Sequence, residues 1–188
     1  MAYLPDFVYN KKMEGGDPDM LRSWLPGLGG GLLKALILGL GGGILSFCAG
    51  QALPRKWFSS EAFPFRPFVW EQGGRCYERL GVRRWKDVLP DMSRLVPGMV
   101  KKKAALNRTP EAMDRLVRET CVAEAVHWAL ILCMTPLLAY AVPGPLGALI
   151  ALGYALGNLL FVIIQRYNRP RLVEIRKRLE MRRKNDFD

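Results

Sequence analysis

Three long apolar stretches alternate with strongly charged segments along the 188 residues of the chain. Residues 28–53 carry Lys34 as their only charge, and residues 126–142 and 146–164 contain no Asp, Glu, Lys or Arg. A helix rises about 1.5 Å per residue, so the last two stretches would extend about 26 and 28 Å. A bilayer has a hydrocarbon thickness of about 30 Å. Each stretch is therefore predicted to be a transmembrane helix, and buried helices of a soluble protein are the alternative.

The predicted fold class is all-α: a polytopic membrane protein with about three transmembrane helices, an interfacial aromatic and basic segment, and a basic cytoplasmic tail helix. A cleaved signal peptide is the other interpretation of the first stretch, but its late start and its length favour a retained helix. The single domain, 1–188, divides into an extracytoplasmic segment 1–27, transmembrane helices 28–53, 123–142 and 146–164, a cytoplasmic or interfacial loop and helix 54–122, and the tail 165–188.

The net charge of +11 is concentrated beside the apolar stretches. Residues 54–122 hold 15 basic and eight acidic side chains, and residues 165–188 hold nine basic and four acidic ones. By the positive-inside rule both segments are predicted to be cytoplasmic, which places the N-terminus outside in a multi-pass protein of the cell membrane. Basic groups next to membrane spans favour lipid headgroups or phosphorylated cofactors as partners, and no nucleic acid is expected.

Two further patterns indicate contacts with lipid or with a second chain. Aromatic and basic residues are mixed between residues 55 and 70, which is typical of the headgroup zone. This segment is predicted either to anchor the protein at the interface or to line an entrance for a lipid substrate. Ala35, Gly39 and Gly43 recur every fourth residue in the first stretch, so a homo-oligomer could form through the Gly39/Gly43 face.

Helix signals define the second half of the chain. Thr109 is a predicted N-cap, followed by Pro110 at the first helical position, and one helix is expected from Pro110 to Val142. Prolines at 143 and 145 predict a turn before the third span. Pro170 is then expected to begin a separate tail helix.

Polar residues form a stripe on each of the last two predicted spans. A helix turns by about 100° per residue, so Thr120, Glu124 and His127 share one face of the second span. By the same spacing Asn158, Gln165 and Arg169 share one face of the third. Counting from the turn places both stripes at the cytoplasmic mouth of the helical hairpin, where polar groups are candidates for function.

The residue types of these stripes suggest proton transfer. Glu124 could hold the imidazole of His127 in one tautomer, so that its other nitrogen accepts a proton from a hydroxyl group. Arg166 and Arg169 could bind phosphates or stabilise developing negative charge. With a single histidine in the chain, no metal site is predicted. The alternative is a salt-bridged helix pair, with Trp128 as an anchor at the membrane interface.

Several motifs resemble one protein family. They are WEQGGRCYERLGVRRWKD (70–87), WKDVLPD (85–91), ETCVAEAVHW (119–128) and NLLFVIIQRYNRPRL (158–172). Together they resemble the glycosyl-4,4'-diaponeurosporenoate acyltransferase family of small bacterial membrane proteins. The resemblance implies esterification of a glycosylated carotenoid, or of another glycolipid, with a fatty acid.

We therefore expect an acyltransferase that moves a fatty acyl group from a thioester donor, acyl-CoA or acyl carrier protein, to a hydroxyl of a membrane glycolipid. No bound cofactor is expected. A membrane-embedded isoprenoid-lipid methyltransferase and a non-catalytic membrane subunit are the alternatives. The predicted catalytic residues are His127, Glu124, Gln165 and Arg166. The predicted substrate-binding residues are Asn158, Arg169, Asn168, Tyr167, Glu119, Trp128, Trp85, Lys86 and Asp87.

Overall fold

The computed structural model describes residues 18–88, 109–142 and 144–186, with side chains from residue 29 onward. Most of the predicted extracytoplasmic segment, the lysine-rich part of the predicted loop and the last two tail residues lie outside the described residues. Within the described ranges all regular secondary structure is helical, which confirms the predicted fold class.

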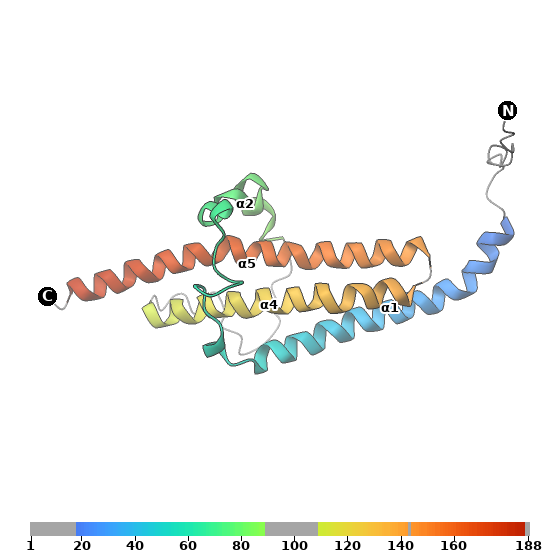
Figure 1. Ribbon diagram of the computed structural model, residues 1–188, viewed down its shortest axis with the longest axis horizontal. Coiled ribbons are helices and arrows are strands. Elements are labelled where there is room, and N and C mark those ends of the chain that lie inside the picture. Colours follow the sequence, from blue (N-terminus) through green and yellow to red (C-terminus); the bar gives the residue numbers. More distant parts are fainter. Residues whose placement is uncertain (1–17, 89–108, 143, 187–188) are drawn as a thin grey trace, which may run out of the picture.

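Three long helices form the body of the molecule: α1 (Pro18–Ala52), α4 (Pro110–Ala141) and α5 (Pro145–Asn185). Helices α4 and α5 form an antiparallel hairpin, and α1 packs along α4 (Figure 1). Each of the three is long and apolar enough to cross a membrane, with the candidate span of α1 at Gly29–Ala52. The prediction of three helices long and apolar enough to span a membrane is therefore confirmed, and these helices fit a multi-pass membrane protein.

The predicted start of α4 is also confirmed. Thr109 has an extended backbone, and its side-chain oxygen accepts a hydrogen bond from the Ala112 N–H at 3.2 Å. This N-cap satisfies one of the backbone donors that the first turn of a helix leaves free. At the other end of the hairpin, Gly144 turns the chain with φ at 77°, a conformation that favours glycine. Gly147 lies so close to the Val142 carbonyl that a Cβ atom would approach its oxygen to 2.0 Å.

The prediction that Pro170 begins a new helix is wrong. Helix α5 continues through Pro170 to Asn185 as a single element. A proline inside a helix removes one backbone hydrogen bond and costs about 3 kcal/mol. Arg166 and Arg169 are both anchored by several hydrogen bonds immediately before the proline, and these contacts offset that cost.

Residues 54–88 form a compact layer across the α4–α5 pair, which we call the cap. It contains two 3₁₀ turns and two short helices: η1 (Arg55–Trp57), η2 (Val69–Gly74), α2 (Arg75–Arg79) and α3 (Val82–Trp85). The cap crosses the helix pair, with η1 against α4 and with η2 and α2 against α5 (Figure 1). Gly74 has φ at 93°, and the Tyr167 carbonyl oxygen lies 3.4 Å from the position of an added Cβ atom. The chain therefore uses glycine where the cap approaches the backbone of α5.

The aromatic residues of the cap divide between its core and its surface. Phe58 and Phe65 are buried and pack against Cys121 and Val122 of α4. Other aromatic side chains are largely exposed, namely those of Trp57, Phe63 and Trp70. The segment predicted as an interfacial anchor therefore also supplies hydrophobic core between the cap and the bundle.

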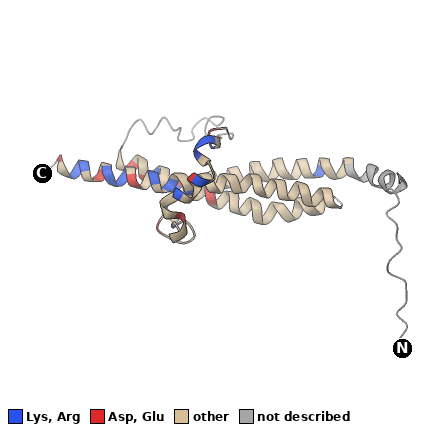
Figure 2. Cartoon of the chain, turned by 90° about the horizontal axis from the view of Figure 1, so that it is seen from above, with Lys and Arg blue, Asp and Glu red and all other residues tan. Residues whose placement is uncertain are grey.

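Among the residues whose side chains the structure describes, the charged ones are concentrated in one half of the molecule, and Lys34 of α1 lies in the other half. Figure 2 shows lysine, arginine, aspartate and glutamate gathered around the cap and the C-terminal half of α5, while the other half of the long helices is nearly free of them. The stretches without charge cover residues 35–54, 125–144 and 145–165, of which the last would extend about 31 Å as a helix. These stretches lie side by side and match the hydrocarbon thickness of a bilayer, about 30 Å.

Candidate functional site

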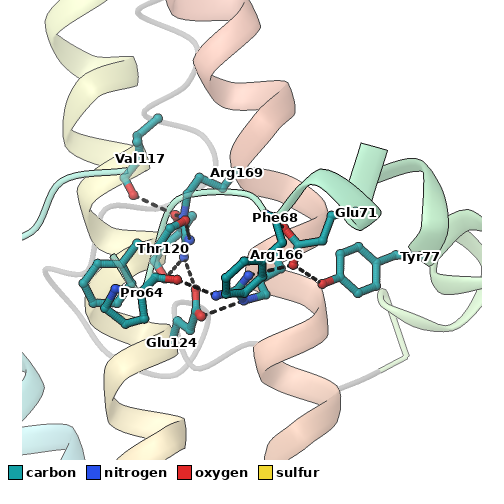
Figure 3. Close-up of polar contacts among 10 residues, drawn as sticks. Pro64, Phe68, Glu71, Tyr77, Val117, Thr120, Glu124, Arg166 and Arg169 are labelled. Carbon is teal, nitrogen blue, oxygen red and sulfur yellow. Dashed lines mark hydrogen bonds and ion pairs between the residues drawn. The ribbon is translucent and has the colours of Figure 1, made fainter. Parts of the chain in front are cut away.

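A buried network of charged side chains joins the cap to the helical hairpin. Glu71 of the cap, Glu124 of α4, and Arg166 and Arg169 of α5 are exposed by 2%, 0%, 9% and 2%, respectively. Figure 3 shows the four side chains converging between α4, α5 and the cap. Buried charges are tolerated only when they are paired and hydrogen-bonded, and each of these four is.

Arg166 connects three segments of the chain. Its Nε donates to Glu124 at 2.7 Å, its Nη1 to Glu71 at 2.6 Å, and its Nη2 to the Pro64 carbonyl oxygen at 2.6 Å. The guanidinium also lies over the Phe68 ring, 4.8 Å from its centroid. One side chain of α5 therefore contacts α4 and two places in the cap, in the planar fork geometry that arginine provides.

Arg169 makes a parallel set of contacts one helical turn further along α5. Its Nε donates to the Thr120 hydroxyl at 2.9 Å, and its Nη1 donates to the Phe65 carbonyl oxygen at 2.6 Å. Its Nη2 donates to the Thr120 carbonyl oxygen and to the second carboxylate oxygen of Glu124. Glu124 is thus held by both arginines, one on each oxygen (Figure 3).

Glu71 completes the network from the side of the cap. It accepts hydrogen bonds from the Phe68 N–H at 2.9 Å and from the Tyr77 hydroxyl at 2.6 Å. Burial raises the pKa of Tyr77, and its hydrogen bond to Glu71 raises that pKa further. Tyr77 therefore remains protonated at neutral pH and keeps its hydroxyl available as a donor to the carboxylate.

The network is electrically balanced and closed. Two arginines face two carboxylates, and each guanidinium nitrogen of both arginines donates to a carboxylate, a hydroxyl or a carbonyl oxygen. Sequence reasoning assigned Arg166 and Arg169 to phosphate binding or to charge stabilisation during the reaction. In the structure their guanidinium groups belong to the buried ion-pair network that joins the cap to the hairpin.

His127 lies one helical turn from Glu124, toward the uncharged half of α4, and has partners of its own. Its Nδ1 is 2.9 Å from Asn158 Oδ1, and its ring stacks on Phe161 with the centroids 4.8 Å apart and the planes 6° from parallel. The sequence predicted that Glu124 would orient the imidazole. In the structure Asn158 orients the imidazole instead, because both carboxylate oxygens of Glu124 accept hydrogen bonds from arginines.

The contacts of Asn158 define the tautomer of the histidine. Its Nδ2 donates to the Tyr154 carbonyl oxygen at 3.0 Å, which turns its Oδ1 toward the imidazole. An amide oxygen only accepts hydrogen bonds, so Nδ1 of His127 must carry the proton. In a neutral imidazole the Nε2 atom then has a free lone pair, and this atom can accept a proton from a hydroxyl group.

Three of the other predicted site residues meet in a second cluster. Tyr167 is buried against the cap in a hydrophobic cluster against which Trp85 packs, and Lys86 Nζ lies 5.3 Å from the Tyr167 ring centroid. Trp85 itself donates from its indole nitrogen to the Leu80 carbonyl oxygen at 3.0 Å. The residues of the WKD and QRYN motifs are thus in contact, and the contacts we observe are those of a packed core.

The remaining predicted residues are not brought into either cluster. Glu119 forms a partly exposed, two-pronged ion pair with Arg55, at 2.9 and 3.0 Å. Trp128 is exposed by 37%, and Asp87 is also exposed. Gln165 and Asn168 are half-buried, and the hydrogen bonds of the described residues do not include their side chains. No group of three metal-ligating side chains comes together within the described ranges.

Sequence reasoning missed Glu71 and Tyr77. Both belong to the cap, where 3₁₀ turns and positive φ angles give no helical period that would place them on a common face. Both lie within the WEQGGRCYERLGVRRWKD segment, whose resemblance to the family was the only available signal. That signal identified the segment without indicating which of its carboxylates is buried.

Comparison with known proteins gives one consistent family. The family model described as glycosyl-4,4'-diaponeurosporenoate acyltransferase matches residues 54–178, which include the cap, α4 and most of α5. Glycosyl-4,4'-diaponeurosporenoate acyltransferases of Staphylococcus aureus strains N315 and USA300 are each 29% identical over 135 residues, covering 71% of this chain and 80% of theirs. No solved structure matches the chain significantly.

Proposed function

The chain belongs to the glycosyl-4,4'-diaponeurosporenoate acyltransferase family, and from this premise we propose that it is a membrane-embedded enzyme that esterifies a sugar hydroxyl of a glycolipid with a fatty acid from a thioester donor. Its relatives are named for a glycosylated carotenoid acid, so a lipid of this kind is the proposed acceptor. Among the three interpretations of the sequence, acyl transfer is the one that the family supports.

The observation that carries the mechanism is that Nε2 of His127 has no hydrogen-bond partner among the described residues. Asn158 and Phe161 hold the imidazole from its Nδ1 edge and from one face, so the ring has a fixed direction before substrate binds. His127 lies about 4.5 Å along the helix from the charged network at Glu124, within the proposed edge of the hydrocarbon layer. A glycolipid with its sugar in the headgroup zone would present hydroxyl groups at this depth.

In the proposed reaction the hydroxyl oxygen attacks the carbonyl carbon of the thioester while His127 Nε2 accepts the hydroxyl proton. The new C–O bond forms, the C–S bond breaks, and the imidazolium returns the proton to the departing thiolate. Gln165 lies seven residues after Asn158 on the same face of α5, and we propose that it positions the carbonyl group. The charged network keeps the cap fixed over this region of the hairpin.

We further propose that the cap and the C-terminal part of α5 lie in the cytoplasm and that α1 begins on the opposite side. The support is the excess of basic over acidic residues in both segments. Cytoplasmic placement would give the site access to soluble acyl thioesters.

The function is tested by incubating the purified protein, in lipid nanodiscs, with a radiolabelled fatty acyl thioester and a glycosylated carotenoid acid. We expect label to appear in a lipid ester that base hydrolyses, and we expect His127→Ala to form this ester about 10²–10⁴-fold more slowly. Transfer of label from S-adenosylmethionine instead of from the thioester would contradict the proposal.

Asn158 is expected to act as a positioning residue for His127. Asn158→Ala removes the acceptor for Nδ1–H, so the imidazole loses a hydrogen bond worth about 1 kcal/mol, and turnover should fall by about tenfold or less. Asn158→Asp restores an acceptor oxygen and should recover most of the lost turnover. A purely structural role would predict loss of thermal stability in both variants, without this recovery of kcat.

A further inference from the structure

The part of the hairpin beyond the cap is a braced projection, which we call the stalk (residues 110–118 of α4 and 172–185 of α5). Two ion pairs join its helices: Asp114 to Arg176 at 2.6 Å, and Glu111 to Arg183 at 2.7 Å. Figure 1 shows α5 continuing in line with its apolar half and projecting past the start of α4. The stalk is therefore held along the axis of the bundle.

One face of the stalk part of α5 that does not pair with α4 carries two exposed lysines and an exposed methionine. Relative to Lys177, Met181 lies at about +40° and Lys184 at about −20°, whereas Arg183, which pairs with α4, lies at about 240°. The acidic residues that border this face, Glu174 at about +60° and Glu180 at about −60°, are paired with Arg178 and Arg176, respectively. Met181 is exposed by 57%, and both lysines are exposed. Residues 172–186 as a whole hold six basic and three acidic side chains. We call Lys177, Met181 and Lys184 the outer face of the stalk.

The geometry separates this face from the lipid headgroups. With the hydrocarbon edge near Arg166, Lys177 and Lys184 lie about 17 and 27 Å further along the helix axis. The headgroup layer adds about 5–7 Å on each side of a bilayer, so the two lysines lie about 10 and 20 Å beyond it. Charges in physiological salt are screened over about 8 Å. Lipid phosphates at the membrane edge are therefore too far away to account for the outer face, and a soluble acidic partner fits it better.

We infer that the outer face docks an acidic acyl carrier protein, which brings the fatty acyl group as a thioester on its flexible phosphopantetheine arm. This inference rests on the proposed function and specifies the donor. Basic side chains around a central apolar contact match an acidic surface with an apolar patch. The acyl group passes from the carrier sulfur to the lipid oxygen, and the hydroxyl proton ends on the carrier thiol, so no further reactant is required.

Charge reversal on the outer face tests the inference. The double variant Lys177→Glu/Lys184→Glu should raise the KM for palmitoyl-acyl carrier protein by about tenfold, equivalent to about 1.4 kcal/mol, because two attractive contacts become repulsive. Its KM for palmitoyl-CoA should stay unchanged with the same acceptor. The matched control, Arg79→Glu/Arg83→Glu, changes the net charge equally on exposed cap residues and should leave both KM values near those of the wild type.

An unchanged KM for the carrier protein, an equal rise for both donors, or use of palmitoyl-CoA alone by the wild type would each overturn the inference. Binding of palmitoyl-acyl carrier protein to the full-length protein in nanodiscs, measured without acceptor, provides an independent readout. If the wild type forms no ester with either donor, the proposed function fails. Carrier binding that the outer-face variant loses and the control keeps would still support docking, and absence of binding to the wild type would refute it.

Discussion

Replacing His127 with alanine should lower the turnover of acyl transfer by about 10²–10⁴-fold, the usual contribution of a positioned proton-transfer group. The reason is geometric: Asn158 holds the Nδ1 proton, and the lone pair of Nε2 is then the only basic site on the ring. No other histidine exists in the chain to replace it. The measurement is the single-turnover rate of ester formation with saturating thioester and glycolipid.

Two further variants separate loss of the base from loss of packing. His127→Gln can still hydrogen-bond to Asn158 but carries no titratable nitrogen, so it should be about as slow as His127→Ala. Cys133→Ala, an exposed position on the same helix, should have wild-type turnover. If either histidine variant retained turnover within a few fold of the wild type, the imidazole would have no part in proton transfer.

The elements of this protein with strong periodicity were predictable from its sequence. Absence of charge marked the three spans, and Thr109 and Pro110 marked the start of α4. The two polar stripes were also placed at matching heights along the hairpin, because the tight turn before Pro145 sets the register of its two helices. Across the hairpin, Arg169 accordingly contacts Thr120 and Glu124, and Asn158 contacts His127.

Pairing within the stripes was not predictable. Whether Glu124 meets an imidazole or a guanidinium depends on helix rotation, and the two arginines outcompete His127 because charge-assisted hydrogen bonds are the stronger ones. The partners supplied by the cap were also hidden, since its turns rely on positive φ angles at Gln72 and at glycines. Continuation of α5 through Pro170 depends on the tertiary contacts of Arg166 and Arg169, and the helix propensity of the local sequence gives no information about these contacts.

The second large effect is expected for the buried carboxylate of Glu124. Glu124→Gln preserves the shape of the side chain but leaves two buried arginines facing one carboxylate, that of Glu71. Removing one partner from a buried ion pair typically costs about 3–5 kcal/mol, because the remaining charge is left uncompensated. For a chain of this length the apparent melting temperature should fall by roughly 6–20 °C, measured by thermal unfolding in detergent.

Glu119→Gln provides the matched control, since Glu119 is also on α4 and also pairs with an arginine through both oxygens. Its ion pair with Arg55 has side-chain exposures of 22% and 27%. Ion pairs open to solvent contribute only about 0–1 kcal/mol, so this variant should melt within a few degrees of the wild type. Equal melting temperatures for the two variants would show that the buried network does not hold the cap on the hairpin. We expect the melting temperature to fall only in Glu124→Gln. If adding Arg169→Gln to that variant restores part of the lost melting temperature, charge balance in the network is the source of the stability.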